Sequence, residues 1–371
     1  MRRNICQKFT VTINFGGDVI RGLARCKFYP IEKCAQFGTA LFTWLHRLSI
    51  LRVAIHTTIV PASAADYLIL CGMPENCSMT DDARNTVLAR EDWLEKSAHH
   101  RHIVEPWVSP RLARRSLGQS HPVDDFLFEY YPVSPNKLMT WHPGFGMTLE
   151  AHADDSELFP QSAYEFSNGG IHIRHSWITQ RVERIAQTYD FLNITAQRPA
   201  RTGCFGLHEW AMVLGPDEVR HSSWKLRLSQ DEIRATIDDV GLKCTHFDAF
   251  RFFTPIARPL NPIQLTRADQ SEYDQPGCLH ANMDLYKYAQ KFAPIVGSSL
   301  IRDTFALARD IRTVDMQVAP YDLADLGVEP IQVETPEGRA AFAAHQVNFS
   351  ERAVALRQRL VAALEPLVDL S

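Results

Sequence analysis

The stretch from Gly203 to Gly327 constrains the fold more than any other part of this sequence. His, Glu, Asp and Arg are interleaved there with aromatic residues at a density that no other part of the chain reaches. Burying a charge is costly unless the charge is paired, hydrogen-bonded or bound to a metal. Because these segments are apolar enough to be buried, their charges must form either a structural network or a functional site. We expect the fold to bring acids and imidazoles from distant parts of the chain together inside an aromatic-lined hollow.

The composition is that of a globular protein with a substantial core. The chain has 371 residues, of which 45% are hydrophobic and 10% are aromatic. Its net charge is −4, so the composition gives no general attraction to nucleic acid or to anionic membranes. No apolar run reaches the roughly 18–20 residues that a membrane span needs. We therefore expect no membrane partner.

The first 78 residues differ from the rest of the chain. Residues 1–78 carry a net charge of +5 and five of the eight cysteines, whereas residues 79–371 carry a net charge of −9. The first segment shows no sustained helical or strand period, and Met79 is followed by TDDARN, a pattern typical of a helix start. We interpret residues 1–78 as a non-native or disordered N-terminal extension, and residues 79–371 as a single catalytic domain. Because no cysteine pair has CxxC spacing, the remaining cysteines fit a reducing cytoplasm, and we predict a cytoplasmic protein.

The local patterns predict a mainly α fold with a small β component (α+β), formed as a single compact helical domain plus a poorly ordered N-terminal extension. Ser229 and Glu232 form a capping box that starts a helix, and Gly241 stops it. Asn168 and the two glycines that follow predict a β-hairpin, and the aromatic segment 244–253 is β-prone. Further helices are predicted for residues 89–103, 110–118, 177–192, 207–214, 278–293, 298–318 and 336–364.

Two pairs of polar residues have the spacing of a site. His280 and Asp284 are four residues apart on a predicted helix, so both project from the same face. This spacing suits two ligands of one metal, or a histidine oriented by a carboxylate for proton transfer. His246 and Asp248 share a face if their segment is extended.

Glu209 is a third candidate. Residues next to each other on a helix point about 100° apart, so His208 and Glu209 face one site only if a helix end lies nearby. The HEW sequence lacks the second histidine of HExxH, which excludes that zinc-protease motif. Packing beside Trp210 would raise the pKa of Glu209 and suit it to act as an acid or a base.

Asp303 and Asp310 are seven residues apart on one predicted helix, each beside an arginine. Such alternation of charge along a helix is typical of structural ion pairs. We therefore favour a structural network for these two acids, and Asp310 also remains in the pool of candidate site residues.

Four segments of the chain resemble an uncharacterised bacterial family that is commonly labelled 3-methyladenine DNA glycosylase. The segments are GCFGLHEWAMV, HFDAFRFFTPIARPLN, QPGCLHANMDLYKYA and ARDIRTVDMQVAPYDLADLGVEPIQVETPEGRA. The resemblance runs from about Leu88 to the C-terminus and implies hydrolysis of the N-glycosidic bond of alkylated purines in DNA repair. WHPGFG matches only part of the hairpin of helix-hairpin-helix glycosylases, and no helix is predicted after it, so no catalytic residue carries over from that family.

Three hypotheses remain open for the central stretch. In the first, the protein is a cofactor-free glycosylase that acts on damaged DNA; a carboxylate activates water while aromatic rings stack on an extruded base. The residues assigned to it are Asp248 or Glu209 as the carboxylate, His246 as a further catalytic group, Trp210, Phe250, Phe253 and Tyr286 as stacking platforms, and Arg251 as a substrate contact. In the second, Fe, Mn or Zn acts on a small molecule. The ligands assigned to it are His246, His280, Asp284 and Glu209. In the third, the charges form a structural network without catalysis.

Overall fold

The computed structural model describes residues 8–15, 18–25, 86–131, 133–215 and 224–368. Contacts along the chain divide it into two units, Met1–Thr80 and Asp81–Ser371, which are described separately. In the first unit, strand β1 (Lys8–Phe15) pairs antiparallel with β2 (Asp18–Arg25). The expectation of no strand period in this part of the chain was wrong, because KFTVTINF alternates polar and apolar residues as strands do. Nothing in the described residues tests the other expectations for residues 1–78, and the helix start at Met79 lies outside them.

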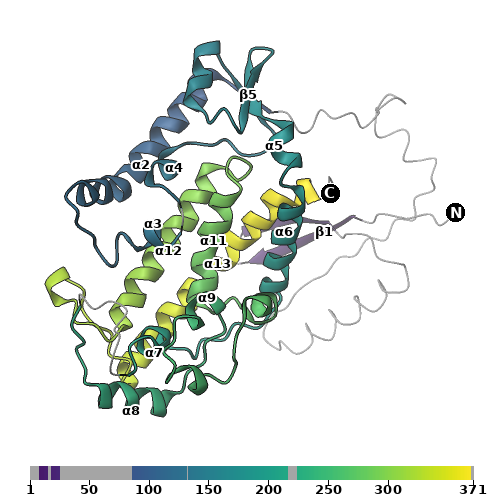
Figure 1. The fold of residues 1–371 in the computed structure, drawn as a ribbon. Coiled ribbons are helices and arrows are strands. Elements are labelled where there is room, and N and C mark those ends of the chain that lie inside the picture. Colours follow the sequence, from purple (N-terminus) through teal and green to yellow (C-terminus); the bar gives the residue numbers. More distant parts are fainter. Residues whose placement is uncertain (1–7, 16–17, 26–85, 132, 216–223, 369–371) are drawn as a thin grey trace. The chain divides into compact units, whose positions relative to one another are not determined.

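The second unit is mainly helical with one small sheet, which confirms the predicted α+β class (Figure 1). The sheet has the order β3-β4-β6-β5. Strand β3 (Thr86–Leu88) is parallel to β4 (Met147–Glu150), and β6 (Gly170–Ile173) pairs antiparallel with both β4 and β5 (Tyr164–Ser167). The turn between β5 and β6 confirms the predicted hairpin; its central residues, Asn168 and Gly169, have φ values of 51° and 74°, as tight hairpin turns require.

Three helices form the centre of the second unit. Helix α11 (Leu279–Lys291) packs against both α12 (Ser298–Val318) and α13 (Pro336–Val368), and α6 (Val182–Ala196) packs on α13 (Figure 1). Nearly every residue of α11 is buried. Because polar residues of α11 are therefore buried as well, each needs a partner in the surrounding elements.

Helix α2 (Arg90–Ser116) is continuous, although two helices were predicted there. It contains Pro106 and Pro110, which remove backbone donors from the helix interior. Trp93, Val104 and Val108 anchor one face of the helix in the core. The buried apolar face therefore holds the helix together across positions at which local propensity would end it.

The segment 244–253, predicted to be β-prone, contains instead the short helix α9 (Phe247–Phe250). The side chain of Asn261 accepts a hydrogen bond from the Cys244 backbone N–H (2.8 Å) and donates one to the Cys244 carbonyl (3.1 Å). These bonds occupy the groups that a neighbouring strand would use. His246 lies at the N-cap of α9, so the expected pairing of His246 and Asp248 on one strand face does not form.

The remaining helices frame this core. The capping box is confirmed: the Ser229 hydroxyl accepts from the Glu232 N–H, and α8 (Gln230–Val240) ends at Gly241. The predicted helix 177–192 is two helices. Asp303 and Asp310 pair with arginines of α13 at 2.7 and 2.6 Å, which confirms their structural interpretation. The other short helices are α3 (Phe126–Tyr130), α4 (Pro135–Met139), α5 (His175–Thr179), α7 (Leu207–Ala211), α10 (Gln270–Tyr273), and the 3-10 turns η1 (Ala153–Leu158), η2 (Arg258–Leu260), η3 (Arg267–Asp269) and η4 (Ala324–Leu326).

In the parts of the chain that the structure describes, no helix combines the length and the apolar character that crossing a membrane would require.

Candidate functional site

The short helix α7 is docked on the end of α12 by a close backbone approach. Phe205 and Gly206, which precede α7, both have positive φ values, 47° and 68°. A Cβ on Gly206 would lie only 2.4 Å from Val318 Cγ2, so this position needs glycine for contact as well as for conformation. Trp210 of α7 donates from Nε1 to the Val318 carbonyl at 2.7 Å. This docking directs the other polar residues of α7 towards α12.

His208, Glu209, Arg312 and Asp315 form a buried group that we call the first cluster. His208 Nε2 lies 2.9 Å from Asp315 Oδ1. Arg312 Nη1 donates to Glu209 Oε1 at 3.0 Å and to Asp315 Oδ2 at 2.9 Å. Burial opposes protonation of His208, but the Asp315 carboxylate outweighs it and raises the pKa of the imidazole. Burial alone would raise the pKa of Asp315, whereas His208 and then Arg312 hold it well below its usual range.

Arg312 is fixed from its outer side as well. Its Nη2 donates to the Pro122 carbonyl at 3.3 Å, and its guanidinium carbon lies 3.7 Å from the centroid of the Phe126 ring. A guanidinium stacked on an aromatic face and held at both ends has little freedom to move. Arg312 therefore presents a fixed positive charge to the two carboxylates of the first cluster.

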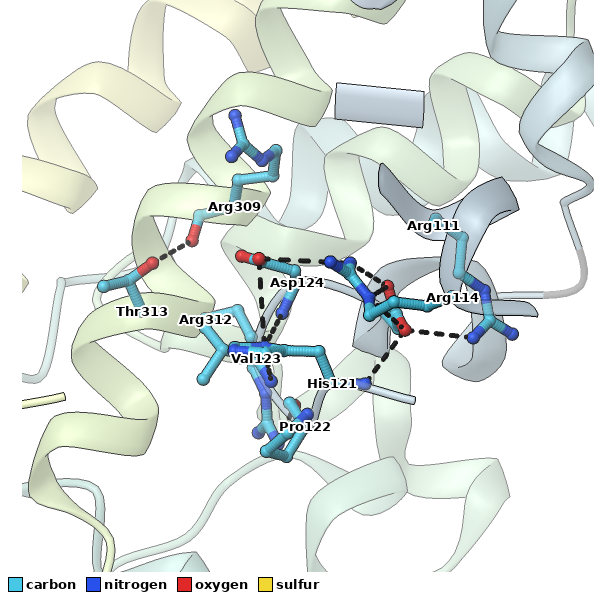
Figure 2. A network of polar contacts seen from close by, with 10 residues as sticks. Arg111, Arg114, His121, Pro122, Val123, Asp124, Arg309, Arg312 and Thr313 are labelled. Carbon is cyan, nitrogen blue, oxygen red and sulfur yellow. Dashed lines mark hydrogen bonds and ion pairs between the residues drawn. The ribbon is translucent and has the colours of Figure 1, made fainter. Parts of the chain in front are cut away.

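Asp125 holds the loop that supplies the Pro122 carbonyl. It accepts hydrogen bonds from Arg111 Nη1 (3.0 Å), Arg114 Nε (3.0 Å) and the His121 backbone N–H (2.9 Å). Figure 2 shows the His121–Asp124 segment between Arg312 on one side and the Arg111 and Arg114 side chains on the other. Burial opposes ionisation of Asp125, but Arg114 outweighs it and lowers the pKa of this carboxyl. These arginines therefore support the site from outside.

Four buried atoms of the first cluster have no hydrogen-bond partner among the described residues: His208 Nε2, Glu209 Oε2, Asp315 Oδ1 and Arg312 Nε. His208 Nε2 and Asp315 Oδ1 nevertheless form an ion pair at 2.9 Å. One ligand atom from each of His208, Glu209 and Asp315 lies within 4.8 Å of the others. Imidazole and carboxylate groups in this arrangement suit Zn, Mn or Fe.

His246, Asp274, Asp284 and Lys287 form a second cluster. His246 Nε2 lies 3.7 Å from a carboxylate oxygen of Asp274 and 3.7 Å from one of Asp284. Asp284 accepts from the Tyr131 hydroxyl at 2.8 Å and from Lys287 Nζ at 2.5 Å. Burial would raise the pKa of Asp284, but Lys287 and then His246 hold it well below its usual range. Burial raises the pKa of Asp274, and His246 only partly offsets that shift.

His280 lies between the two clusters. Its ring centroid is 4.5 Å from that of His208, edge to face, and 5.3 Å from that of His246, stacked. Neither ring nitrogen of His280 makes a hydrogen bond to the part of the chain that the structure describes. Burial and the two neighbouring imidazoles hold the pKa of His280 well below its usual value, so the ring stays neutral.

A cavity of about 240 Å³ adjoins His208 and His280. Its walls are mostly apolar and include Leu207, Leu242 and Phe253. Cys204, Cys244 and Cys278 also line it, each from a different part of the chain, and no Asp or Glu belongs to its lining. Burial raises the pKa of all three thiols, so they remain protonated and unreactive.

The structure brings some of the predicted site residues together. Glu209 belongs to the first cluster, His246 and Asp284 belong to the second, and His280 lies between them. Phe253 lines the cavity. The predicted metal ligands are thus divided between two clusters, and the three residues that converge share only Glu209 with that set.

Other predicted residues lie away from the cavity. Asp248 is bound by Arg251 (3.1 Å) and Arg267 (3.0 Å), and Arg251 is itself exposed. Trp210 and Tyr286 are completely buried in the core, and Phe250 is buried against Phe253 without lining the cavity. Of the four aromatic residues that were predicted to contact substrate, three belong to the core and one lines the cavity. Aromatic residues in the sequence therefore do not distinguish a cavity wall from the core.

Sequence reasoning missed Arg312 and Asp315 as site residues. It left either His208 or Glu209 open as a functional residue but assigned a role only to Glu209, because neighbouring helical residues point apart. Helix α7 has only five residues, and both of its polar side chains reach α12. Arg312 and Asp315, three residues apart on a long helix, were the available signal, since residues at that spacing share a face. No spacing signal connects the three cysteines.

A scan of protein-family models, a search of curated proteins and a search of solved structures each give no match to this chain. The site is therefore interpreted from its own geometry.

Proposed function

We propose that the second unit is a metal-dependent enzyme that acts on a small molecule, with one Zn, Mn or Fe ion held by His208, Glu209 and Asp315. The observation that carries this proposal is the convergence of three buried ligand residues, each with an atom that has no hydrogen-bond partner. Buried polar atoms without partners are rare in native proteins, because each costs about 1–3 kcal/mol. A cation held by these three residues would take one ligand atom from each.

The charge balance of the first cluster leaves room for one further positive charge. With His208 neutral, its two carboxylates exceed the single guanidinium of Arg312 by one negative charge. A buried net charge is unfavourable unless it is compensated. A divalent ion supplies that compensation, and so would a proton on His208; the protonated state corresponds to a purely structural network. Metal content distinguishes the two.

The cavity provides the place for a substrate. His208 contributes both to the first cluster and to the cavity lining, which places the proposed ion beside the cavity. An ion held there would polarise a bound carbonyl or activate water. His280 also lines the cavity, and its ring nitrogens have no hydrogen-bond partner in the described residues, so its neutral ring can donate or accept a hydrogen bond to a bound molecule.

Metal analysis of the purified full-length chain tests the proposal. We expect about one equivalent of Zn, Mn or Fe, either as purified or after removal of metal and reloading, and a higher unfolding temperature on reloading. Glu209→Gln should lower the metal content at least tenfold, whereas the matched variant Asp284→Asn in the second cluster should keep it. A content well below one equivalent after reloading, with no change in unfolding temperature, would overturn the proposal in favour of the structural network.

The resemblance to the glycosylase-labelled family supplies a second candidate function, the hydrolysis of the N-glycosidic bond of alkylated purines. The observation that favours it is the Phe253 ring in the cavity wall, beside the helix that carries Glu209. The positions of Asp248, Trp210 and Tyr286 give it no support. Its test is the release of methylated purines from alkylated DNA at low salt, with Glu209→Gln as the control variant. No release would remove this candidate.

We also propose that the protein works in a reducing compartment such as the cytoplasm. The three cysteines that the structure describes are all free, although all line one cavity. Free cysteines are typical of proteins kept in a reducing environment.

A further inference from the structure

We propose that the cavity beside His208 and His280 binds a small molecule with an anionic head and a mainly apolar body, the head lying at Arg201 and Lys243. This inference deepens the proposed function, on which it rests for the reaction that follows binding. The binding itself depends only on the shape and charge of the cavity.

The charged groups of the cavity lining are all of one sign. Arg201 and Lys243 are exposed at its rim, while His208 and His280 are buried at its base. Neither rim side chain makes an ion pair or a hydrogen bond with the described part of the chain. Most arginines near the site differ in this respect, as Arg251, Arg267 and Arg312 each pair with a carboxylate. Two free cations at the mouth of a cavity without acids favour an anionic ligand.

The backbone of Arg201 is held in place by Gln275. The Gln275 side chain accepts a hydrogen bond from the Arg201 N–H at 2.8 Å and donates one to the Arg201 carbonyl at 3.2 Å. A Cβ on Gly277 would lie 2.5 Å from the Arg201 carbonyl oxygen, so only glycine permits this approach. Arg201 therefore extends from a fixed point of the rim.

Lys243 lies on the same side of the rim. A Cβ on Gly203 would lie 3.7 Å from Lys243 Cδ and 3.8 Å from Nζ, so the ammonium group runs along the backbone two residues after Arg201. Both cations therefore belong to the part of the lining around residues 201–203, and the proposal assigns one anionic group to the two of them. A carboxylate and a phosphate monoester share this chemistry, and both form charge-assisted hydrogen bonds with such groups.

The walls and the volume define the rest of the ligand. Between the cationic rim and the imidazoles, the lining is formed mainly by Leu207, Leu242, Phe253, Leu279 and the cysteines. A volume of about 240 Å³ equals that of roughly eight liquid waters, so the body has on the order of eight to ten non-hydrogen atoms. Burial of such an apolar body contributes about 25 cal/mol for each Å² removed from water.

Calorimetric titration of the full-length chain with a matched series tests the proposal: hexanoate, hexyl phosphate, the neutral hexanol, and acetate, which has a head without a body. We expect hexanoate or hexyl phosphate to bind at least tenfold more tightly than hexanol, and acetate to bind at least tenfold more weakly than hexanoate. The tighter of the two anions identifies the head. Equal binding of hexanol and both anions, or no binding by any of the four, would overturn the proposal.

Variants assign the selectivity to the rim. Lys243→Gln and Arg201→Gln should each weaken binding of the anion about tenfold and leave hexanol unchanged, whereas Lys225→Gln, an exposed lysine outside the cavity, should have no effect. Unchanged anion binding in both rim variants would contradict the proposal. Glu209→Gln should lose the metal but keep the preference for anions, so failure of the metal proposal and failure of this one give different results.

Discussion

The two clusters beside His280 have the same composition but differ in how their charges are satisfied. Each contains one imidazole, two carboxylates and one cation. In the first cluster the cation is a buried guanidinium, and one oxygen of each carboxylate lacks a hydrogen-bond partner. In the second, the ammonium of Lys287 is about one-third exposed and shares Asp284 with the Tyr131 hydroxyl.

The two clusters differ in whether their ligand atoms lie close together. The second cluster also has unpartnered atoms, on His246 and on Asp274, but among the described residues only the first cluster offers three ligand atoms within 4.8 Å. An exposed lysine on a flexible stem adjusts to its carboxylate, whereas a guanidinium held at both ends does not. Because Arg312 is fixed, the carboxylate oxygens that it binds are also held in place. A metal ion needs ligand atoms held in place in this way.

The largest expected effect compares one acid from each cluster. Asp315→Asn should lower the free energy of unfolding by about 3–5 kcal/mol, because it removes a buried carboxylate that contacts both Arg312 and His208. Asp274→Asn should cost clearly less, since burial already raises the pKa of Asp274 towards the neutral form that asparagine imitates. Urea unfolding measures both. Equal losses would show that the clusters are energetically alike and would break the comparison.

The comparison also needs the pH dependence of stability that comes from outside the two clusters. His142 is expected to contribute most of it. Burial lowers the pKa of His142 to about 4, with His100 adding to the shift, and its Nδ1 lies 2.9 Å from the Tyr164 hydroxyl. Because the unfolded chain binds this proton near pH 6.5 and the folded chain does not, stability falls as pH drops from about 6.5 to about 4. The loss between pH 7.5 and 5 should be about 2 kcal/mol.

Urea unfolding of wild type and His142→Gln at both pH values measures this contribution. The variant should lose most of it, and any pH dependence that remains belongs to other groups, those of the clusters included. An unchanged pH dependence in the variant would remove His142 as the source.

A smaller effect is expected for Asp284 Oδ1 of the second cluster, which accepts a hydrogen bond from Tyr131. Tyr131→Phe removes the hydroxyl that donates to Asp284 at 2.8 Å, while Lys287 remains bound. The free energy of unfolding should fall by about 1–1.5 kcal/mol, and the metal content should not change. A fall in metal content would show that the two clusters act as one site.

The smallest expected effect is the loss of an exposed ion pair, which shows how much surface charge contributes to the free energy of unfolding. Arg359→Gln breaks the pair with Asp303 at 2.7 Å between α13 and α12, in which the two side chains are 46% and 36% exposed. Exposed ion pairs contribute about 0–1 kcal/mol, so unfolding should change by no more than that. A larger loss would mean that ion pairs on these helices cannot serve as a baseline for the buried clusters.

Local signals predicted the elements whose stability is local. The capping box of α8, the hairpin at Asn168 and the bounds of α12 follow from neighbouring residues alone, and the structure confirms them. Predictions failed where distant residues decided the outcome. Asn261 converts the segment at Cys244 from a potential strand, and core packing carries α2 through two prolines.

The sequence by itself determined that this chain is mainly helical and that charged residues of its central stretch must be buried together. It placed Glu209, His246, His280 and Asp284 among the candidates for that burial. Only the tertiary structure decided which imidazole contacts which carboxylate, and that His208 and Asp315 converge with Glu209. The physical reason is that electrostatic interaction depends on distance and on solvent exclusion, and both are set by the packing of α7 against α12.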